Sequence, residues 1–263
     1  MKLGIKILSA ILALYIFVFF AVKFGWTNVR GVVDKQLAQV SALELVTPAW
    51  AESEEWQTLK LAILKDKAVL EKVASETDLP ARLIVAAIVP EQLRLFHDER
   101  EIFKQVFLPL KILGNQTQFS WGVAGLKPET AEKIEQNLLD QTSVFYPGAK
   151  YRDLLNLQTT DTDQNSARFA RITDEQDRYF SYLYTALYLR QVMSQWEKAG
   201  FDISQKPEIL ATLFNIGFQN SVPKANPQAG GSEIEIAGQK YSFGRLAYEF
   251  YYSRELETEF VRN

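Results

Sequence analysis

The chain has 263 residues, no cysteine, one histidine, and 29 basic against 32 acidic residues, for a formal net charge of −3. This composition excludes disulfides, thiolate nucleophiles and thiolate metal sites, and the lack of a basic block argues against a nucleic-acid partner. His97 lies in a charged run and is expected on the surface, so a histidine-based zinc site is not expected. Any chemistry is therefore expected to use carboxylates, hydroxyls and amides, without a metal or cofactor.

The N-terminus predicts a membrane anchor. Residues 7–22 are an unbroken run of apolar and small residues, ILSAILALYIFVFFAV, and counting from Leu3 the segment reaches the roughly 20 residues that cross a bilayer core. The alternative, a cleaved signal peptide, lacks a small-x-small site directly after this run. We expect an uncleaved transmembrane helix in residues 1–26 with the rest outside the cytoplasm, followed by a juxtamembrane linker in residues 27–52.

Residues 53–263 predict one mainly helical domain. Ser53 is a plausible N-cap, and helical spacing of apolar residues continues to about residue 75. Pro80 is expected to open a helix over residues 81–89, and Pro90 to kink or end it just before Glu91.

The remaining pattern predicts further helices with one hairpin. In chain order we expect a helix over 99–108, a helix from Pro128 to about Leu139, a long loop or insertion over 140–172, a capping box at 173–176 that opens the longest helix and ends at Gly200, an apolar helix over 207–219, a short hairpin over 234–241 around Gly238, and a helical tail in which Ser253 caps a last turn.

Glu91 is the first candidate for chemistry. It directly follows the strongly apolar stretch 83–90. A carboxyl group placed against that much hydrocarbon is disfavoured in its charged form, and an acid that stays protonated is what general acid catalysis of glycosidic cleavage requires. The plainer alternative is a solvated residue at the end of a buried helix.

A second segment of interest is residues 120–131, SWGVAGLKPETA. Gly122 and Gly125 allow a tight turn and a close approach of the backbone to a ligand, and a helix that begins at Pro128 adds its N-terminal dipole. An ordinary glycine turn before a helix explains the same pattern.

The third segment is residues 211–217, ATLFNIG. Asn215 places an amide in an otherwise apolar helix, and a buried amide needs a hydrogen-bonding partner. That partner is either a ligand or another group of the protein core.

In this order the three segments resemble the lysozyme-like superfamily, and specifically the lytic transglycosylases that cut peptidoglycan. Members of that family have a helix that ends in a catalytic Glu, then Ser-x-Gly-x-x-Gln-(apolar)-x-Pro-x-Thr-Ala, then Ala-Tyr-Asn-x-Gly. The resemblance covers roughly residues 75–220. Besides Glu91, the matching positions are Ser120, Gly122, Pro128, Thr130, Ala131, Asn215 and Gly217.

The chain also departs from the family pattern. Gln92 stands where Ser usually follows the Glu, Gly125 where Gln is expected, Phe214 where Tyr is common, and Leu213 where a small residue is usual. The segments are also spaced further apart than in compact members, which implies inserted loops at about 95–118 and 140–172. These departures leave open a protein that binds glycan without cutting it.

The resemblance implies a mainly α, lysozyme-like fold (α+β with minor β) and a membrane-anchored enzyme that acts on peptidoglycan glycan strands. Glu91 would act as acid and then base on the bond between N-acetylmuramic acid and N-acetylglucosamine, leaving a 1,6-anhydromuramoyl end. Ser120 and the Gly122 backbone would hold the sugar. Asn215 would bind an acetamido group or orient the acid.

The resemblance also implies aromatic contacts with the sugar. Trp121 is the first candidate to stack on a sugar face, followed by Tyr241 and Tyr248, and Phe214 would line the site in place of the family's Tyr. Most other aromatic side chains are expected in the core.

Two alternatives to the lytic enzyme remain. One is a catalytically weakened glycan-binding or scaffold component of a cell-envelope machine. The other is a lysozyme-type hydrolase, which needs a second carboxylate, such as Glu99 or Asp161, within about 9.5 Å of Glu91. An open groove with Glu91 on its floor and Asn215 opposite favours an enzyme, whereas an ion pair between Glu91 and Arg94 favours the scaffold.

Overall fold

The computed structural model describes residues 15–17, 32–35, 37, 47–97, 121–156 and 163–262, and the side chains of residues 95–97 are outside this description. The chain divides into two units, residues 1–30 and residues 31–263. In the first unit, residues 15–17 are helical and exposed, and the rest of the predicted membrane segment lies outside the described residues. Within the described ranges, no helix is both long and apolar enough to cross a membrane.

The second unit is mainly helical, as predicted. Its helices are the 3-10 helix η2 (Ala49–Glu52), α3 (Glu54–Lys65), α4 (Lys67–Thr77), α5 (Ala81–His97), α7 (Pro128–Leu139), the 3-10 helix η4 (Ala149–Tyr151), α8 (Gln164–Ile172), α9 (Tyr179–Lys198), α10 (Pro207–Ile216), the 3-10 helix η5 (Phe218–Asn220) and α11 (Phe243–Tyr252). Its strands are β1 (Val32–Val33), β2 (Gly230–Gly231), β3 (Glu233–Ile236) and β4 (Gln239–Ser242).

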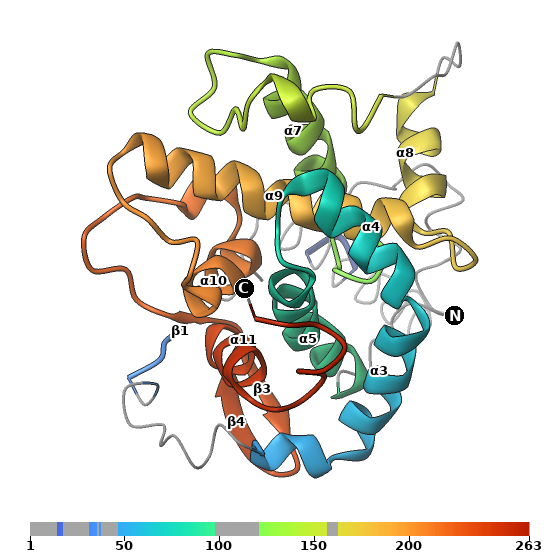
Figure 1. Ribbon diagram of the computed structural model, residues 1–263, viewed down its shortest axis with the longest axis vertical. Helices are drawn as coiled ribbons and strands as arrows, with labels where there is room; N and C mark the ends of the chain where they lie inside the picture. Colours follow the sequence, from blue (N-terminus) through green and yellow to red (C-terminus); the bar gives the residue numbers. More distant parts are fainter. Residues whose placement is uncertain are drawn as a thin grey trace, which may run out of the picture. The chain divides into compact units, whose positions relative to one another are not determined.

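Helix α5 lies in the middle of this unit, with α3, α4, α9, α10, α11 and β3 packed around it (Figure 1). Residues 82–91 are all buried, on every side of the helix. A helix that is apolar all round reaches this state only where other elements cover each of its faces. The apolar stretch before Glu91 is therefore the centre of the core.

Arg82, on the first turn of α5, holds the C-terminal tail. Its guanidinium is fully buried and donates hydrogen bonds to five backbone carbonyls, those of Phe250, Tyr251, Ser253, Glu255 and Phe260. Burial lowers the pKa of Arg82 to about 10. This cation thus satisfies carbonyl groups in the last turn of α11 and in the tail after it, which would otherwise lack donors.

The strands form two small antiparallel pairs. β3 and β4 make the predicted hairpin, with Ile234 opposite Tyr241 and a turn at Gly238, whose φ is +77°. β1 pairs with β2 through Val32 opposite Gly231. Part of the segment expected as a linker therefore belongs to the folded unit, which begins at Gly31.

Three predictions of local structure are wrong. The first helix is two helices, α3 and α4, that meet at Asp66. The supposed loop over 140–172 contains η4 and α8. The capping box at Thr173 does not start a helix, since Thr173 ends α8 and its hydroxyl donates to the Phe169 carbonyl at 2.8 Å.

Other boundaries agree with the sequence pattern. Ser53 caps α3 by accepting from the Trp56 backbone N–H, and α7 spans the predicted range. α10 begins at Pro207 as predicted, but it ends at Ile216 instead of residue 219, because Gly217 ends it and the separate helix η5 follows. In the tail α11 forms as expected, although Ser253 lies at its C-terminal end.

Candidate functional site

Glu91 lies inside α5, so Pro90 does not end the helix, which was one of the two outcomes expected there. α5 continues through Pro90 to His97. A proline removes one hydrogen bond from the helix ladder. Buried Val89 and Leu93 flank this point and keep α5 packed in the core on both sides of it. The Glu91 side chain consequently starts from a rigid helix in the core.

The Glu91 carboxylate is paired with Arg94, one turn later on the same helix. Glu91 is 3% exposed, and Nη2 of Arg94 lies 2.6 Å from its Oε1 and 2.7 Å from its Oε2. The Arg94 side chain keeps 22% of its surface exposed, but its Nε is buried and has no hydrogen-bond partner among the described residues. The guanidinium therefore binds Glu91 through one nitrogen, Nη2, which lies close to both carboxylate oxygens.

The second motif segment forms a closed turn. The backbones of Trp121 and Leu126 pair antiparallel, with N–H to carbonyl distances of 2.6 and 2.9 Å, and the Gly125 N–H donates to the Gly122 carbonyl. Gly122 and Gly125 have φ of +67° and +60°. The backbone of this turn therefore requires the two glycines, because a residue without a Cβ adopts a positive φ at little cost.

This turn lies directly against Glu91. A Cβ on Gly125 would overlap the Glu91 carboxylate, whose Cδ would be only 2.7 Å away. The Gln92 side chain donates to the Val123 carbonyl, across 31 positions of sequence. Gln92 and Gly125, both of which differ from the family pattern, thus lie at the same contact. Gln92 binds the turn, and Gly125 has no Cβ that would overlap the Glu91 carboxylate.

Ser181 on α9 holds the turn from its other side. Its hydroxyl accepts from the Val123 N–H at 2.8 Å, and Ser181 is itself buried. A Cβ on Gly122 would come within 2.6 Å of the Ile172 carbonyl and would overlap the Ser181 hydroxyl. Sequence reasoning did not find Ser181, because a serine within a long helix gives no signal of a contact 58 positions away.

The aromatic candidates lie in the core. Trp121 is 1% exposed and packs edge-to-face on Phe169 with ring centroids 5.3 Å apart, and its buried Nε1 has no hydrogen-bond partner within the described part of the chain. Phe214 is 9% exposed and packs edge-on against Tyr188. Neither ring exposes a face to solvent, as stacking on a sugar would require.

Tyr241 occupies β4, outside the Glu91 turn. It is 3% exposed, its hydroxyl donates to Gln239 Oε1 at 2.7 Å, and the Arg245 guanidinium lies 4.9 Å from its ring centroid. Tyr248, the other tyrosine considered for stacking, is partly exposed on α11 and contacts the ring of Tyr252. The structure does not bring these two residues to the Glu91 turn.

Asn215 has its partner within the protein. Its Oδ1 accepts from the backbone N–H of Ser232 at 2.8 Å and from the Ser232 hydroxyl at 3.1 Å. Asn215 therefore connects the last turn of α10 to the segment between β2 and β3. α10 packs against α5, so the third motif segment lies on a neighbour of the Glu91 helix.

Several predicted residues lie outside the described part of the chain. These are Ser120, both candidates for a second carboxylate (Glu99 and Asp161), and the side chain of His97. Among the described residues, no group of three or more His, Asp or Glu side chains could hold a metal ion.

Glu208 is an acid that sequence reasoning missed. It lies in the first turn of α10, and burial raises its pKa above the ordinary value for glutamate. Its neighbour Tyr252 has a raised pKa, first because of burial and then because of the Glu208 charge. Glu208 is thus a second partly buried carboxyl group against which the role of Glu91 can be tested.

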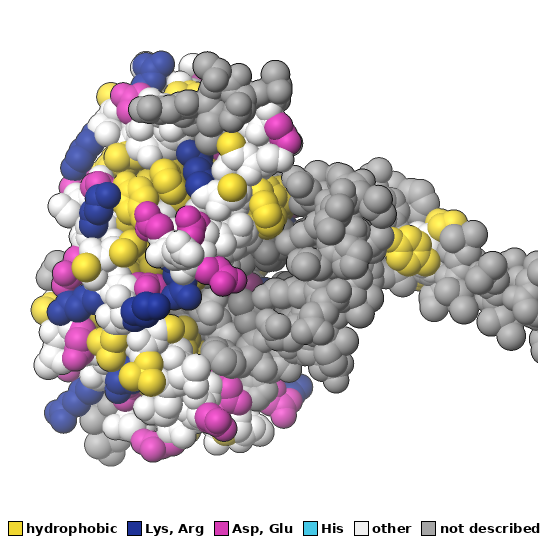
Figure 2. Space-filling model, turned by 90° about the vertical axis from the view of Figure 1, so that its right-hand side faces the viewer, with side chains coloured by type: hydrophobic (Ala, Val, Ile, Leu, Met, Phe, Trp, Pro, Cys, Tyr) yellow, Lys and Arg dark blue, Asp and Glu magenta, His cyan; other side chains and the backbone are white. Residues whose placement is uncertain are grey.

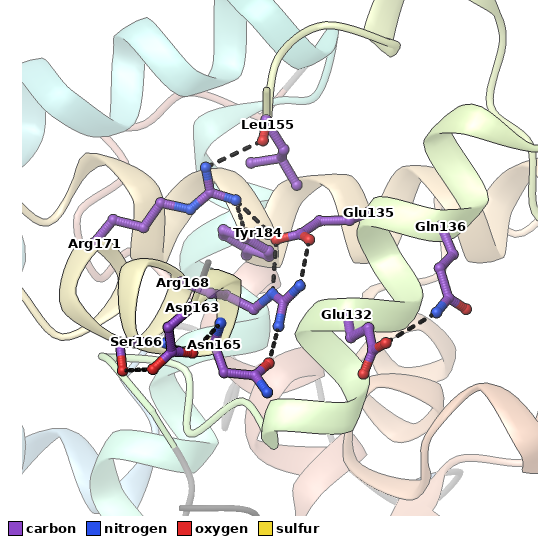
Figure 3. Close-up of polar contacts among 10 residues, drawn as sticks. All are labelled: Glu132, Glu135, Gln136, Leu155, Asp163, Asn165, Ser166, Arg168, Arg171 and Tyr184. Atoms are coloured by element: carbon purple, nitrogen blue, oxygen red, sulfur yellow. Dashed lines mark hydrogen bonds and ion pairs between the residues drawn. The ribbon is translucent and has the colours of Figure 1, made fainter. Parts of the chain in front are cut away.

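A separate polar network surrounds Glu135 of α7 (Figure 3). Arg168 of α8 donates from Nε and Nη2 to the two carboxylate oxygens at 2.9 and 2.7 Å. Arg171 adds a bond at 2.8 Å, and the Tyr184 hydroxyl of α9 also donates to Glu135. Burial acts to raise the pKa of Glu135, but the bonds from Arg168 and Tyr184 and the arginine charges outweigh it and lower that pKa.

The surface charge is mixed on the face shown in Figure 2. In its described part, basic and acidic side chains are interspersed, with apolar side chains between them. Such a face has no large field of one sign to attract a charged polymer over a distance.

Comparison with known proteins gives no relative: no family model, no curated protein and no solved structure matches this chain. The resemblance in the motif segments therefore rests on their residues alone.

Proposed function

We propose that this protein is a membrane-anchored lytic transglycosylase that cleaves peptidoglycan outside the cytoplasm, with Glu91 as its single acid and base. The observation that carries the proposal is the contact between two motif segments. The glycine turn of the second segment lies against the Glu91 carboxylate, and Gln92 joins the same turn to α5.

The proposed chemistry needs one carboxyl group. Protonated Glu91 gives its proton to the glycosidic oxygen as the bond from C1 of N-acetylmuramic acid breaks. The carboxylate then takes the proton of the C6 hydroxyl as that oxygen bonds to C1, which yields a 1,6-anhydro ring and restores the acid. No water is consumed, so no second carboxylate is required as a nucleophile or base. A retaining or inverting hydrolase, by contrast, uses a pair.

A second candidate function is a glycan-binding scaffold without catalysis. The Glu91–Arg94 ion pair favours it, because both carboxylate oxygens bind the Arg94 guanidinium, at 2.6 and 2.7 Å, instead of facing a glycosidic oxygen. Burial of Trp121 also favours it, since the enzyme hypothesis placed this ring on the sugar.

The test is a digest of purified peptidoglycan by the full-length protein in detergent, with products identified by mass spectrometry. Glu91→Gln is compared with wild type and with Glu208→Gln, which removes another partly buried carboxyl group. We expect anhydromuramoyl products from wild type and Glu208→Gln, and a loss of at least about 100-fold in Glu91→Gln, as for removal of a general acid.

The other outcomes are distinct. Products with free reducing ends would assign a hydrolase. No products from any of the three proteins, with binding to glycan retained, would assign the scaffold function. Activity that is lost in Glu208→Gln and kept in Glu91→Gln would move the acid to α10.

A further inference from the structure

The net charge of the Glu91–Arg94 pair depends on whether Glu91 is protonated. When Glu91 is charged, it neutralises the guanidinium at 2.6 Å. When Glu91 is protonated, as a general acid must be, the guanidinium keeps its charge because arginine does not lose its proton in proteins. Arg94 then becomes a cation with 78% of its side-chain surface buried and without its counter-ion, since the side chain is 22% exposed.

Such a cation is costly unless another anion replaces the lost one. Removing one partner of a largely buried ion pair leaves an uncompensated charge. The guanidinium is also incompletely satisfied within the protein, because its buried Nε has no hydrogen-bond partner among the described residues. A carboxylate on a bound molecule that reaches the exposed part of the side chain would supply the missing charge, since guanidinium groups bind carboxylates through charged hydrogen bonds.

From this geometry we propose that Arg94 binds a carboxylate of the glycan, and that this carboxylate takes the guanidinium from Glu91 as the acid becomes protonated. In peptidoglycan this group is the lactyl carboxylate of muramic acid, which is free only where the stem peptide has been removed. The substrate class is therefore peptide-free glycan. This inference rests on the proposed function for the identity of the polymer, but the Arg94 site itself does not depend on cleavage.

The proposal has a reciprocal consequence. If the substrate carboxylate and the Glu91 charge compete for Arg94, neutralising Glu91 must strengthen the binding of the carboxylate. Glu91→Gln reproduces the shape and the neutral state of the protonated acid. It also prevents cleavage during a binding measurement.

The experiment is calorimetric titration of the full-length protein in detergent with two probes. One is a short peptide-free glycan with free lactyl carboxylates, and the other is the same glycan with each carboxylate converted to the methylamide. We expect Glu91→Gln to bind the carboxylate glycan about tenfold more tightly than the amide glycan, in keeping with a charged hydrogen bond. Adding Arg94→Gln is expected to remove this preference.

Two controls separate the site from general charge effects and from misfolding. Arg254→Gln in the Glu91→Gln background removes an exposed arginine elsewhere and is expected to keep the preference. Arg94→Lys retains the charge, and is expected to keep part of the preference even if Arg94→Gln folds poorly.

The outcomes also separate this inference from the proposed function. Equal binding of both glycans by Glu91→Gln, or no binding of either, overturns the Arg94 site. A preference that needs Arg94, in a protein whose wild type yields no cleavage products, supports the site while the transglycosylase proposal fails. Cleavage that depends on Glu91, with no preference between the probes, leaves the enzyme without the Arg94 site.

Discussion

Glu135 and Glu91 both bind arginine, but the arginines come from different places in the fold. Glu135 on α7 is bound by Arg168 and Arg171 of α8 and by Tyr184 of α9, so its network joins three helices. Glu91 is bound by Arg94, which belongs to the same helix. The first network is a cross-link between elements, whereas the second ion pair connects no separate parts of the fold.

This difference indicates which of the two carboxylates contributes more to the stability of the fold. A carboxylate that connects three helices restricts their relative positions, and its removal leaves two buried cations unpaired. An ion pair within one helix adds no such restraint, although burying its charges also has a desolvation cost. The Glu91–Arg94 ion pair therefore contributes less to joining helices than the Glu135 network does.

The largest expected effect is at Glu135. Glu135→Gln should lower the free energy of unfolding by about 3–5 kcal/mol, because Arg168 and Arg171 remain buried without their counter-charge. Denaturant titration followed by circular dichroism measures this loss. A loss below 1 kcal/mol would contradict the idea that the network is a cross-link.

The pH dependence of stability is a second test of the Glu135 network. The pKa of Glu135 is lowered in the folded state, since its hydrogen bonds and ion pairs outweigh the opposing effect of burial. Its contribution is thus fully present above the ordinary glutamate pKa, given as 4.5, and is lost as the pH falls through the lower folded value. The stability difference between wild type and Glu135→Gln should shrink over that acidic range. A difference that is constant from pH 7 to pH 3 would argue against this assignment.

Gly125 tests the contact between the turn and Glu91. Gly125→Ala should cost about 1 kcal/mol for its positive φ and about 1–3 kcal/mol more for overlap with the carboxylate. Gly238→Ala is the matched control, because Gly238 has φ of +77° but open space around its Cα. Thermal unfolding compares the two variants. Adding Glu91→Ala to Gly125→Ala should recover the excess, and no recovery would mean that the turn does not touch Glu91.

Ser181 tests the other anchor of the turn. Ser181→Ala removes the acceptor for the Val123 N–H and should cost about 1–2 kcal/mol. Amide hydrogen exchange should accelerate at Val123. Unchanged exchange there would show that another group protects this amide.

The smallest expected effect on stability is at Glu91 itself. Glu91→Gln should lower the free energy of unfolding by about 1 kcal/mol, less than Glu135→Gln, because it leaves one partly exposed cation without its counter-charge instead of two more deeply buried ones. Chemical denaturation beside Glu135→Gln gives the comparison directly. Equal destabilisation by the two variants would make Glu91 a structural residue, and the contrast between the two regions would disappear.

The helical class and several helix boundaries could be predicted from the amino-acid sequence, because they depend on local rules. The Ser53 cap and the prolines that begin α7 and α10 act within one or two turns of backbone, and the structure confirms them. Gly238 likewise marks the hairpin, since a positive φ is a local requirement. The error at Thr173 is also local in origin, because its hydroxyl can bond back to Phe169 as readily as it can cap a following helix.

The contacts around the candidate site, by contrast, depend on tertiary packing and could not be predicted from local sequence. The continuation of α5 through Pro90 depends on packing on all its sides, and the pairing of Gln92 and Ser181 with Val123 joins positions 31 and 58 residues apart. The burial of Trp121 against Phe169, and the partner of Asn215 at Ser232, depend in the same way on how distant helices meet. A residue type states which bonds a side chain is able to form, but the packed fold determines which of them it makes.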